Sequence, residues 1–331
     1  MTKSDDYLWD REAGDVDPEV ARLEQLLAPL RHQAPLDELR LRRTRTRIPV
    51  MLGIATAIAA MLAVVVWWRT SPGDPQPCAG ATGFKFIAKG GDVSCGDAAM
   101  ANGELPIGIA LDTGPHEAEL AIAHIGTAQL GTHTRVRLDR TSRDRHQLYL
   151  EHGRMHARVS APPRIFAVAT PSVQVTDLGC EYAIDIDATG AGSIHVVTGK
   201  VELESGTGAL VVVPAGSHAR LLPGRRAGVP LSDRAGAGIE AAVHDFEGGV
   251  ANMLVGVLAA ASRDDVVTVA NLVGLVPAAD RRRVLERLSQ LVPAPQGLTI
   301  DEALADRALF EMWFDEAILV HLGISSVKNS P

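Results

Sequence analysis

The sequence predicts a multi-domain membrane protein: a short helical cytoplasmic segment, one transmembrane helix, an all-β domain and a C-terminal small helical bundle. Three observations predict this fold class. Residues 48–68 carry no charge, apolar and polar residues alternate from Phe84 to Ser232, and helical spacings return after residue 241. We therefore expect a cytoplasmic segment at 1–47, a membrane span at 48–68, a stalk at 69–83, an all-β domain at 84–235 and a helical region at 236–331.

Composition narrows the functional classes. The chain has 331 residues, of which 46% are hydrophobic, so it is long enough for about two domains and is not disordered throughout. Its net charge of -8 gives no strongly basic surface, and the one basic run lies next to the uncharged stretch. We therefore expect no direct nucleic-acid partner.

The uncharged stretch at 48–68 has the length of a membrane-spanning helix. Twenty-one residues at about 1.5 Å each cover roughly 32 Å, which matches a hydrocarbon core of about 30 Å. Five arginines precede the stretch and only Arg69 follows it closely, which predicts that residues 1–47 lie on the cytoplasmic side, residues 70–331 lie outside and the lipid bilayer is a partner. A secretory signal peptide is the alternative, although its apolar stretch is usually only about 7 to 15 residues long. The arginines are Arg40, Arg42, Arg43, Arg45 and Arg47.

The first 47 residues carry an apolar stripe that the segment cannot bury by itself. Asp17 and Pro18 are typical of a helix start, and the leucines that follow are spaced three and four residues apart. A segment this small cannot bury a sufficient core alone, so we expect its apolar face to bind another protein. A mostly disordered stem or a self-associating helix remains the alternative. The expected contact residues are Leu8, Trp9, Val20, Leu23, Leu26, Leu27 and Leu30.

The alternating region predicts many short antiparallel strands. Gly, Pro and Asp signals separate the strands, and no helical pattern intervenes. A sandwich, a barrel and stacked hairpins all fit this spacing. The clearest alternating stretches are 117–125, 135–138, 147–150, 155–160, 165–169, 172–176, 182–187, 193–198, 201–204, 210–214 and 218–222.

The last region predicts four helices, near 242–261, 263–275, 278–292 and 300–321. Ser262 with Asp265 and Thr299 with Glu302 have the spacing of capping boxes. The stretch 250–261 is apolar all round but too short to cross a bilayer, so we expect it to be a buried helix.

Three cysteines follow the uncharged stretch. A disulfide between Cys78 and Cys95 would close a loop of sixteen residues and contribute about 3 kcal/mol. Cys180 is then left over, and we expect it to be a small buried thiol.

The sequence offers little that indicates catalysis or metal binding. Asp112-Thr113-Gly114 is the tripeptide of aspartic proteases, but such an enzyme needs two carboxylates, and a turn at the end of a strand fits the tripeptide better. His152 and His156 would lie roughly 13 Å apart on a strand, and His195 and His218 fall in neighbouring strands. We expect no catalytic residue, metal or cofactor, and solvated strand histidines.

One block of sequence resembles the FecR family of single-pass regulators. In that family a strand ends in Thr-Pro, and Val, Asp-Leu-Gly-Thr, a phenylalanine and a later Gly-x-Val follow. Here the block reads from Ala169 to Tyr182, with Cys180 at the usual threonine and Tyr182 at the usual phenylalanine, and the resemblance covers roughly 115–222. The residues that match the motif are Thr170, Pro171, Asp177, Leu178, Gly179, Tyr182 and Gly199.

The resemblance implies an anti-sigma factor and not an enzyme. The cytoplasmic segment would bind an extracytoplasmic-function sigma factor, and the FecR-like β domain would sense a signal through an unknown envelope protein or ligand. The resemblance also implies a single-pass protein of the bacterial inner membrane, with its N-terminus in the cytoplasm and its C-terminal domains in the periplasm. The best-known members end in a small α/β domain that meets a TonB-dependent transporter, whereas this chain ends in helices. The alternative is an envelope binding or scaffold protein whose N-terminal part is only an anchor.

Overall fold

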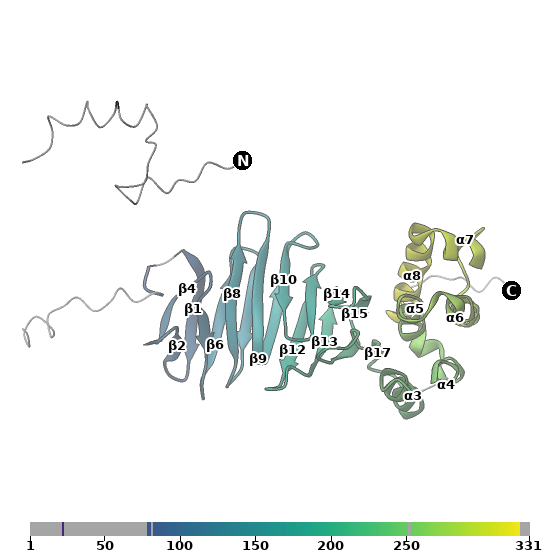
Figure 1. Cartoon of the computed structure of the whole chain (residues 1–331), viewed down its shortest axis with the longest axis horizontal. Coiled ribbons are helices and arrows are strands. Elements are labelled where there is room, and N and C mark those ends of the chain that lie inside the picture. The colour runs from purple at the N-terminus through teal and green to yellow at the C-terminus, as the bar shows by residue number, and fades with distance from the viewer. Residues whose placement is uncertain (1–21, 23–77, 81, 251–252, 325–331) are drawn as a thin grey trace, which may run out of the picture. The chain divides into compact units, whose positions relative to one another are not determined.

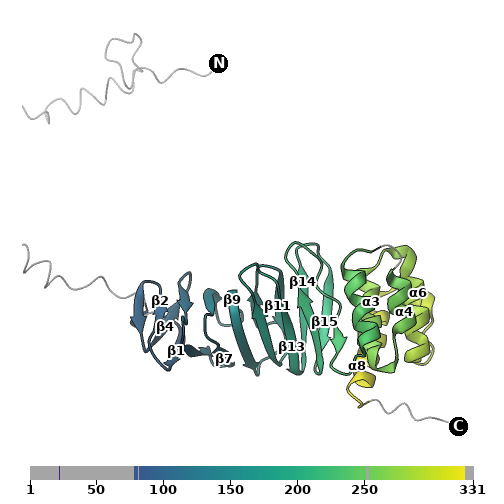
Figure 2. The ribbon, with the colours of Figure 1, turned by 90° about the horizontal axis from the view of Figure 1, so that it is seen from below.

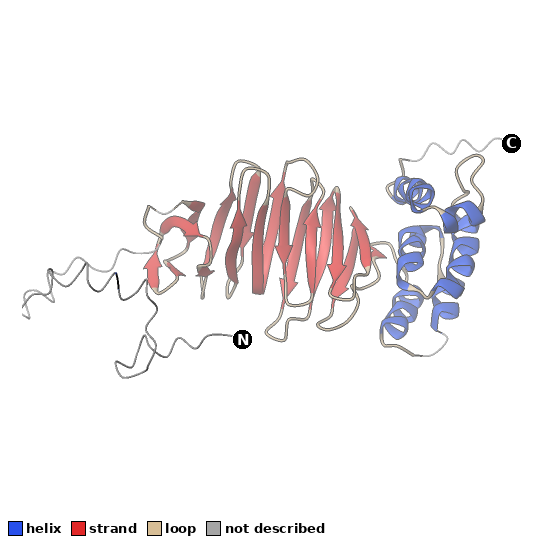
Figure 3. Cartoon of the chain, turned by 45° about the horizontal axis from the view of Figure 1, so that its top comes forward, coloured by secondary structure: helices blue, strands red, loops and turns tan. Residues whose placement is uncertain are grey.

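The computed structural model describes residue 22 and residues 78–80, 82–250 and 253–324. The chain divides into two compact units, 1–71 and 72–331, and almost all described residues belong to the second. Strands occupy 83–232 and helices occupy 237–321, as the red and blue elements of Figure 3 show. The described part is therefore mostly β-sheet with helices at its C-terminal end (Figure 1).

The strands form two ladders that share one long strand, β9 (His146–Val159). All neighbours are antiparallel except β9 and β10, which are parallel. The first ladder runs in the order β4 (Asn102–Pro106), β1 (Gly83–Lys89), β6 (Glu117–Ile122), β7 (Gly126–Leu130), β9, β12 (Glu181–Ile186), β13 (Gly192–Thr198), β16 (Ser217–Leu221) and β17 (Leu231–Ser232). The second runs in the order β3 (Ala98–Met100), β2 (Val93–Cys95), β5 (Ala110–Asp112), β8 (Arg135–Thr141), β9, β10 (Phe166–Ala169), β11 (Val173–Asp177), β14 (Lys200–Ser205) and β15 (Leu210–Pro214).

Strand β9 passes from one ladder to the other at Gly153. Residues up to His152 pair with β8, and residues from Gly153 onward pair with β12. Gly153 has φ +98°, and a Cβ there would lie 2.4 Å from Thr134. Glycine is therefore the residue that allows the chain to change ladders at this point.

The alternation of the sequence explains the core. In β11 and β12 every second residue is buried, because successive side chains of a strand point to opposite faces. The buried faces of both ladders join one apolar cluster whose largest members include Phe84, Phe86 and Phe166.

Six helices follow the strands among the described residues, and Figure 2 shows them directly after β14 and β15. The two predicted capping boxes, at Ser262 and Thr299, are confirmed. The six helices are α3 (Ala237–Glu247), α4 (Met253–Ala260), α5 (Val266–Leu275, preceded by the 3-10 turn Arg263–Asp265), α6 (Ala278–Leu291), α7 (Ile300–Ala305) and α8 (Arg307–His321).

Two of the four expected helices are divided. The stretch 242–261 is broken after α3, where Gly248 and Gly249 end the helix. The stretch 300–321 is broken at Asp306, whose extended backbone ends α7 and whose side chain accepts from the Ala308 amide to begin α8. The expected buried helix at 250–261 is buried on one face only: Leu254, Val257 and Leu258 are buried, whereas Val250 and Val255 are 54% and 52% exposed.

The prediction of a membrane-spanning fold is corrected. Within the described part of the chain no helix is long and apolar enough to cross a bilayer, which needs about 20 apolar residues, and the longest there, α8, has 15. This finding overturns the single-span fold class and, with it, the inner-membrane localisation with a cytoplasmic N-terminus and periplasmic domains. The uncharged stretch 48–68 lies outside the described residues.

The cysteines lie at two different places. Cys78 and Cys95 are joined by a disulfide with a Cα–Cα distance of 6.3 Å, which ties the chain before β1 to the end of β2. Cys180 is a free thiol and is buried.

Candidate functional site

The Thr-Pro part of the family motif forms the turn between β10 and β11. The Thr170 hydroxyl accepts from the Val173 amide at 3.0 Å and donates to the Val173 carbonyl at 2.9 Å. Ser172 donates from its hydroxyl to the Gly190 carbonyl. These side chains satisfy backbone groups of the turn, so their role is to fix its shape.

The Asp-Leu-Gly-Cys part forms a second turn around a buried carboxylate. Asp177 accepts from the Gly179 amide at 2.6 Å and from the Cys180 thiol at 2.8 Å. Burial raises the pKa of Asp177, although these two hydrogen bonds oppose the rise. Burial and the Asp177 carboxylate raise the pKa of the Cys180 thiol, which therefore stays protonated and serves as a donor.

Gly199 and Tyr182 complete the motif by close packing. Gly199 has φ +74°, and a Cβ there would lie 2.4 Å from the Gly179 carbonyl oxygen. The Tyr182 ring is fully buried, and its hydroxyl has no hydrogen-bond partner among the described residues. The motif residues thus lie around one pair of turns and stabilise the β domain, and Leu178 alone among them faces a cavity.

The protease-like tripeptide is a structural turn. The Thr113 hydroxyl donates to the Gly131 carbonyl and accepts from the Thr134 amide, both at 2.8 Å. Asp112 accepts from the Gly114 amide and pairs with Arg135 at 3.4 Å. The residues therefore hold the end of β5 against the start of β8.

Two of the strand histidines contact one carboxylate. His195 and His218 are cross-strand partners, and both contact the Asp233 carboxylate, at 2.8 and 3.2 Å. Burial opposes the effect of these contacts, but the two hydrogen bonds leave the pKa of Asp233 lowered. Across the described ranges no group of three or more His, Cys, Asp or Glu residues is arranged to hold a metal ion.

The helices meet the β domain at an edge strand. We call the contact of β15, β16 and β17 with α5 and α8 the seam. The Asn271 side chain of α5 accepts from the Val212 amide at 2.8 Å and donates to the Val212 carbonyl at 2.9 Å. It therefore takes the place of a neighbouring strand and closes the edge of the second ladder.

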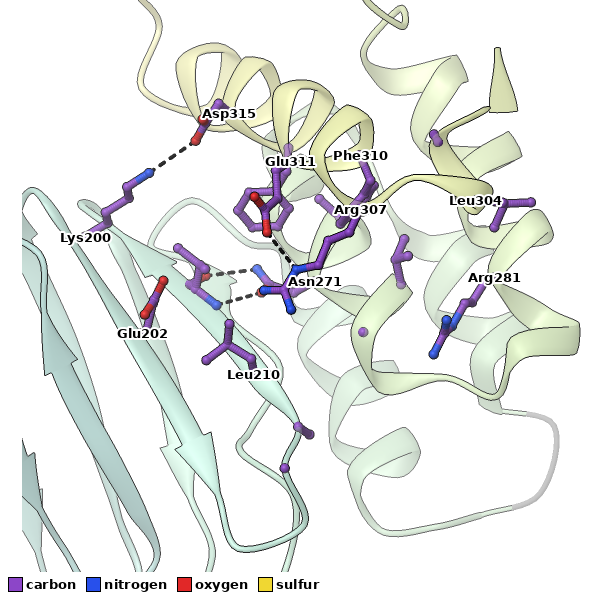
Figure 4. A pocket seen from close by; sticks show the side chains of 18 of the residues that line it. Lys200, Glu202, Leu210, Asn271, Arg281, Leu304, Arg307, Phe310, Glu311 and Asp315 are labelled. Carbon is purple, nitrogen blue, oxygen red and sulfur yellow. Dashed lines mark hydrogen bonds and ion pairs between the residues drawn. The ribbon is translucent and has the colours of Figure 1, made fainter. Parts of the chain in front are cut away.

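A groove of about 570 Å³ opens beside this contact (Figure 4). Strands β14 and β15 form one wall, and helices α5, α7 and α8 form the other, with α6 behind. The apolar part of its lining includes Leu178, Leu210, Leu304, Phe310 and Phe314. A cavity of this size is within the range of small-molecule binding sites.

Charged side chains surround the groove. Lys200 of β14 pairs with Asp315 of α8 at 3.1 Å, across the groove. Arg164 pairs with Glu202 at 2.7 Å, and Arg307 pairs with Glu311 at 2.7 Å. Figure 4 shows Arg307 and Arg281 extending toward the groove from the helical side.

The sequence did not reveal the groove. Its key side chains, Asn271, Arg281 and Arg307, come from three helices, and their proximity is a tertiary property. One local signal was present, because Asn271 is a lone amide in the otherwise apolar helix α5. The expected partner-binding residues Leu8 to Leu30 and the arginines Arg40 to Arg47 lie outside the described residues.

The described residues thus form a β domain held by structural turns, with a ligand-sized groove where helices cover its edge. Residues 111–202 match the family model described as FecR protein, which confirms the resemblance read from the sequence. Members of this family are regulators, and the match supports a role as a sigma-factor regulator.

Comparisons with individual proteins add two solved structures. No curated protein matches the chain. Two crystal structures from Parabacteroides distasonis ATCC 8503, each described as a "putative anti-sigma factor", match at 19% and 15% identity with TM-scores of 0.28 and 0.26. They cover 35% and 47% of this chain and 55% and 63% of their own, so the chain spans little more than half the length of the structures that it matches.

Proposed function

We propose that this protein is a FecR-type anti-sigma regulator that binds an extracytoplasmic-function sigma factor. The match of residues 111–202 to the FecR family is the observation that carries the proposal. The surrounding region supports a role in receiving a signal, because the family motif forms fixed turns of the β domain and a ligand-sized groove lies beside one of them.

The proposed contact with the sigma factor is the apolar stripe of the first 47 residues. Leu23, Leu26, Leu27 and Leu30 recur at spacings of three and four, as expected of a face that is buried on a partner. A segment that orders only on binding gives up part of its interaction energy, so its affinity is adjustable. The β domain and the helices would alter that affinity when a signal reaches them. This requires two conformations of the protein, one that binds the sigma factor and one that does not, and a signal that binds one of them more tightly than the other.

Co-purification from cells tests the proposal with the full chain. The chain is co-expressed with each extracytoplasmic-function sigma factor of its own genome, and transcription from the cognate promoter is measured. We expect one sigma factor to co-purify and its promoter to be silenced. Leu26→Asp should weaken binding at least about tenfold, since burying an unpaired charge in an apolar contact costs more than about 1.4 kcal/mol.

Gln25→Asp is the matched control, because it adds the same charge one position outside the stripe. It should change binding by less than about twofold. Equal losses for the two variants would show that the stripe is not the contact face. If no sigma factor co-purifies with the chain, the proposed function is wrong.

A further inference from the structure

The groove carries one positive charge that the described residues do not neutralise. Its lining holds four cations and three carboxylates, and each carboxylate pairs with one cation. Arg281 of α6 is the cation left over, and it has no ion-pair or hydrogen-bond partner within the described ranges. The cations are Arg164, Lys200, Arg281 and Arg307, and the carboxylates are Glu202, Glu311 and Asp315.

A second cation is only weakly held. The side chains of Arg307 and Glu311 are 76% and 57% exposed, and an exposed pair at this spacing contributes little to stability. Arg307 can therefore exchange Glu311 for an incoming anion with little loss of stability. In Figure 4 its guanidinium lies between α8 and β15, on the side from which Arg281 also reaches inward.

The remaining wall of the groove is apolar. Phe310 and Leu304 are half-buried, and Phe314, at 9% exposure, packs edge-on against the Phe310 ring. Leu210 faces them from β15. An apolar group placed between these walls would remove their exposed surface from water, which is favourable at about 25 cal/mol for each Å².

An added β-strand does not fit this site. Asn271 already occupies both outward-facing backbone groups of Val212, and Pro214 ends β15 without an amide to donate. A ligand therefore meets side chains and not a free strand edge. A phosphate dianion is also disfavoured, because the three carboxylates of the lining leave only one charge to neutralise.

We propose that this groove binds a single carboxylate attached to an apolar group. The Arg281 guanidinium donates two parallel N–H bonds to the carboxylate, Arg307 is the second cation that adds to the attraction, and the apolar group packs on Leu304, Phe310 and Leu210. Two sources supply this chemistry: the C-terminus of a peptide that ends in a large apolar residue, and a free medium-chain organic acid. The site is independent of the sigma-factor contact, so either proposal can fail alone.

Calorimetric titration of the purified full chain tests the site with four probes. These are N-acetyl-Ala-Ala-Phe with a free carboxylate, the same peptide as its C-terminal amide, sodium octanoate and inorganic phosphate. We expect saturable binding of the free-carboxylate peptide or of octanoate, and none of the amide or of phosphate. Arg281→Gln should weaken that binding roughly tenfold or more, as expected for the loss of a charge-assisted hydrogen bond.

Arg283→Gln is the control, because Arg283 is exposed on the same helix, loses the same charge and does not line the groove. It should leave binding within about twofold of the unsubstituted chain. Binding of the peptide alone or of octanoate alone identifies the source and supports the site. The proposal is overturned if neither acid binds at about 1 mM, if phosphate binds more tightly than both, or if the two arginine variants lose affinity equally.

Discussion

The β region and the helical region satisfy their backbones in different ways. Inside the β region each strand bonds to its neighbours, and the two ladders close over an apolar cluster that continues into the helices. Helix α5 of the helical region is buried almost completely, but only because β15 and β17 lie on one side of it and α6 and α8 on the other. The two ladders therefore bury each other's inner faces, whereas helix α5 depends on the strands to bury one of its sides.

Hydrogen bonds between side chains and backbone join the two regions at the seam. Besides Asn271, Thr268 of α5 donates to the Pro230 carbonyl at 2.7 Å, and Arg234 donates to the His321 carbonyl at 2.7 Å. Other side-chain bonds join helix α3 to β16. Loss of a bond at the seam should loosen the helices around it and leave the strands intact, whereas a defect in the β core should unfold both.

The largest effect is expected from Gly199→Val in the β region. The new side chain would adopt φ near +74° and would overlap the Gly179 carbonyl oxygen. Backbone strain and overpacking together should destabilise the protein by roughly 4 kcal/mol. Urea unfolding followed by circular dichroism measures this loss, and strands and helices should unfold together.

Gly224→Val is the matched control for that prediction. Gly224 also has a positive φ, of +67°, but a Cβ there meets no atom within 4 Å. It should therefore cost only the backbone strain, roughly 1 to 2 kcal/mol. If the two valines destabilise the protein equally, close packing at Gly199 is not what the family motif requires.

The next effect is expected from Asn271→Leu at the seam. Leucine keeps a similar shape and leaves the Val212 amide and carbonyl without partners, which should cost roughly 2 kcal/mol. Hydrogen exchange read by mass spectrometry should show faster exchange in α5 and α8 and unchanged exchange in β11 and β12. Asn102→Leu, at an exposed position of β4, serves as the control and should alter neither.

Local patterns of the sequence predicted the strands, because alternation is a property of neighbouring residues. They placed strands at 147–150 and 155–160, and the structure has one strand, β9, that changes ladders between those stretches. Capping boxes were predictable for the same reason, since Thr299 and Glu302 are three residues apart. The order of strands in the ladders was not predictable, because pairing joins residues far apart in the chain.

The errors have physical causes as well. Two adjacent glycines, Gly248 and Gly249, ended a helix that hydrophobicity alone would have continued. The membrane span was inferred from length and arginine asymmetry at 40–68, and the described helices give it no support. The groove escaped notice because Arg281 looks like any exposed helix arginine until the wall opposite it is known.

The smallest effect, and the sharpest test of how the helices attach, is the pH response of His321. Its Nε2 lies 2.9 Å from the Ala215 carbonyl and 3.1 Å from the Ser217 hydroxyl, while its buried Nδ1 has no partner among the described residues. Burial chiefly, with help from the Arg234 charge, lowers the pKa of His321 below its ordinary 6.5, against the opposing influence of the Ala215 hydrogen bond, Asp233 and Asp264.

Because the unfolded chain binds a proton at this position before the folded chain does, stability should be complete above pH 6.5 and should fall as the pH drops below that value toward the lowered pKa. His321→Gln keeps an N–H donor for Ala215 and does not titrate. The melting temperature of the unsubstituted chain should therefore fall relative to that of His321→Gln between about pH 7 and about pH 5. A difference between the two proteins that stays constant over this range would mean that protonation of His321 has no part in holding α8 on the strands.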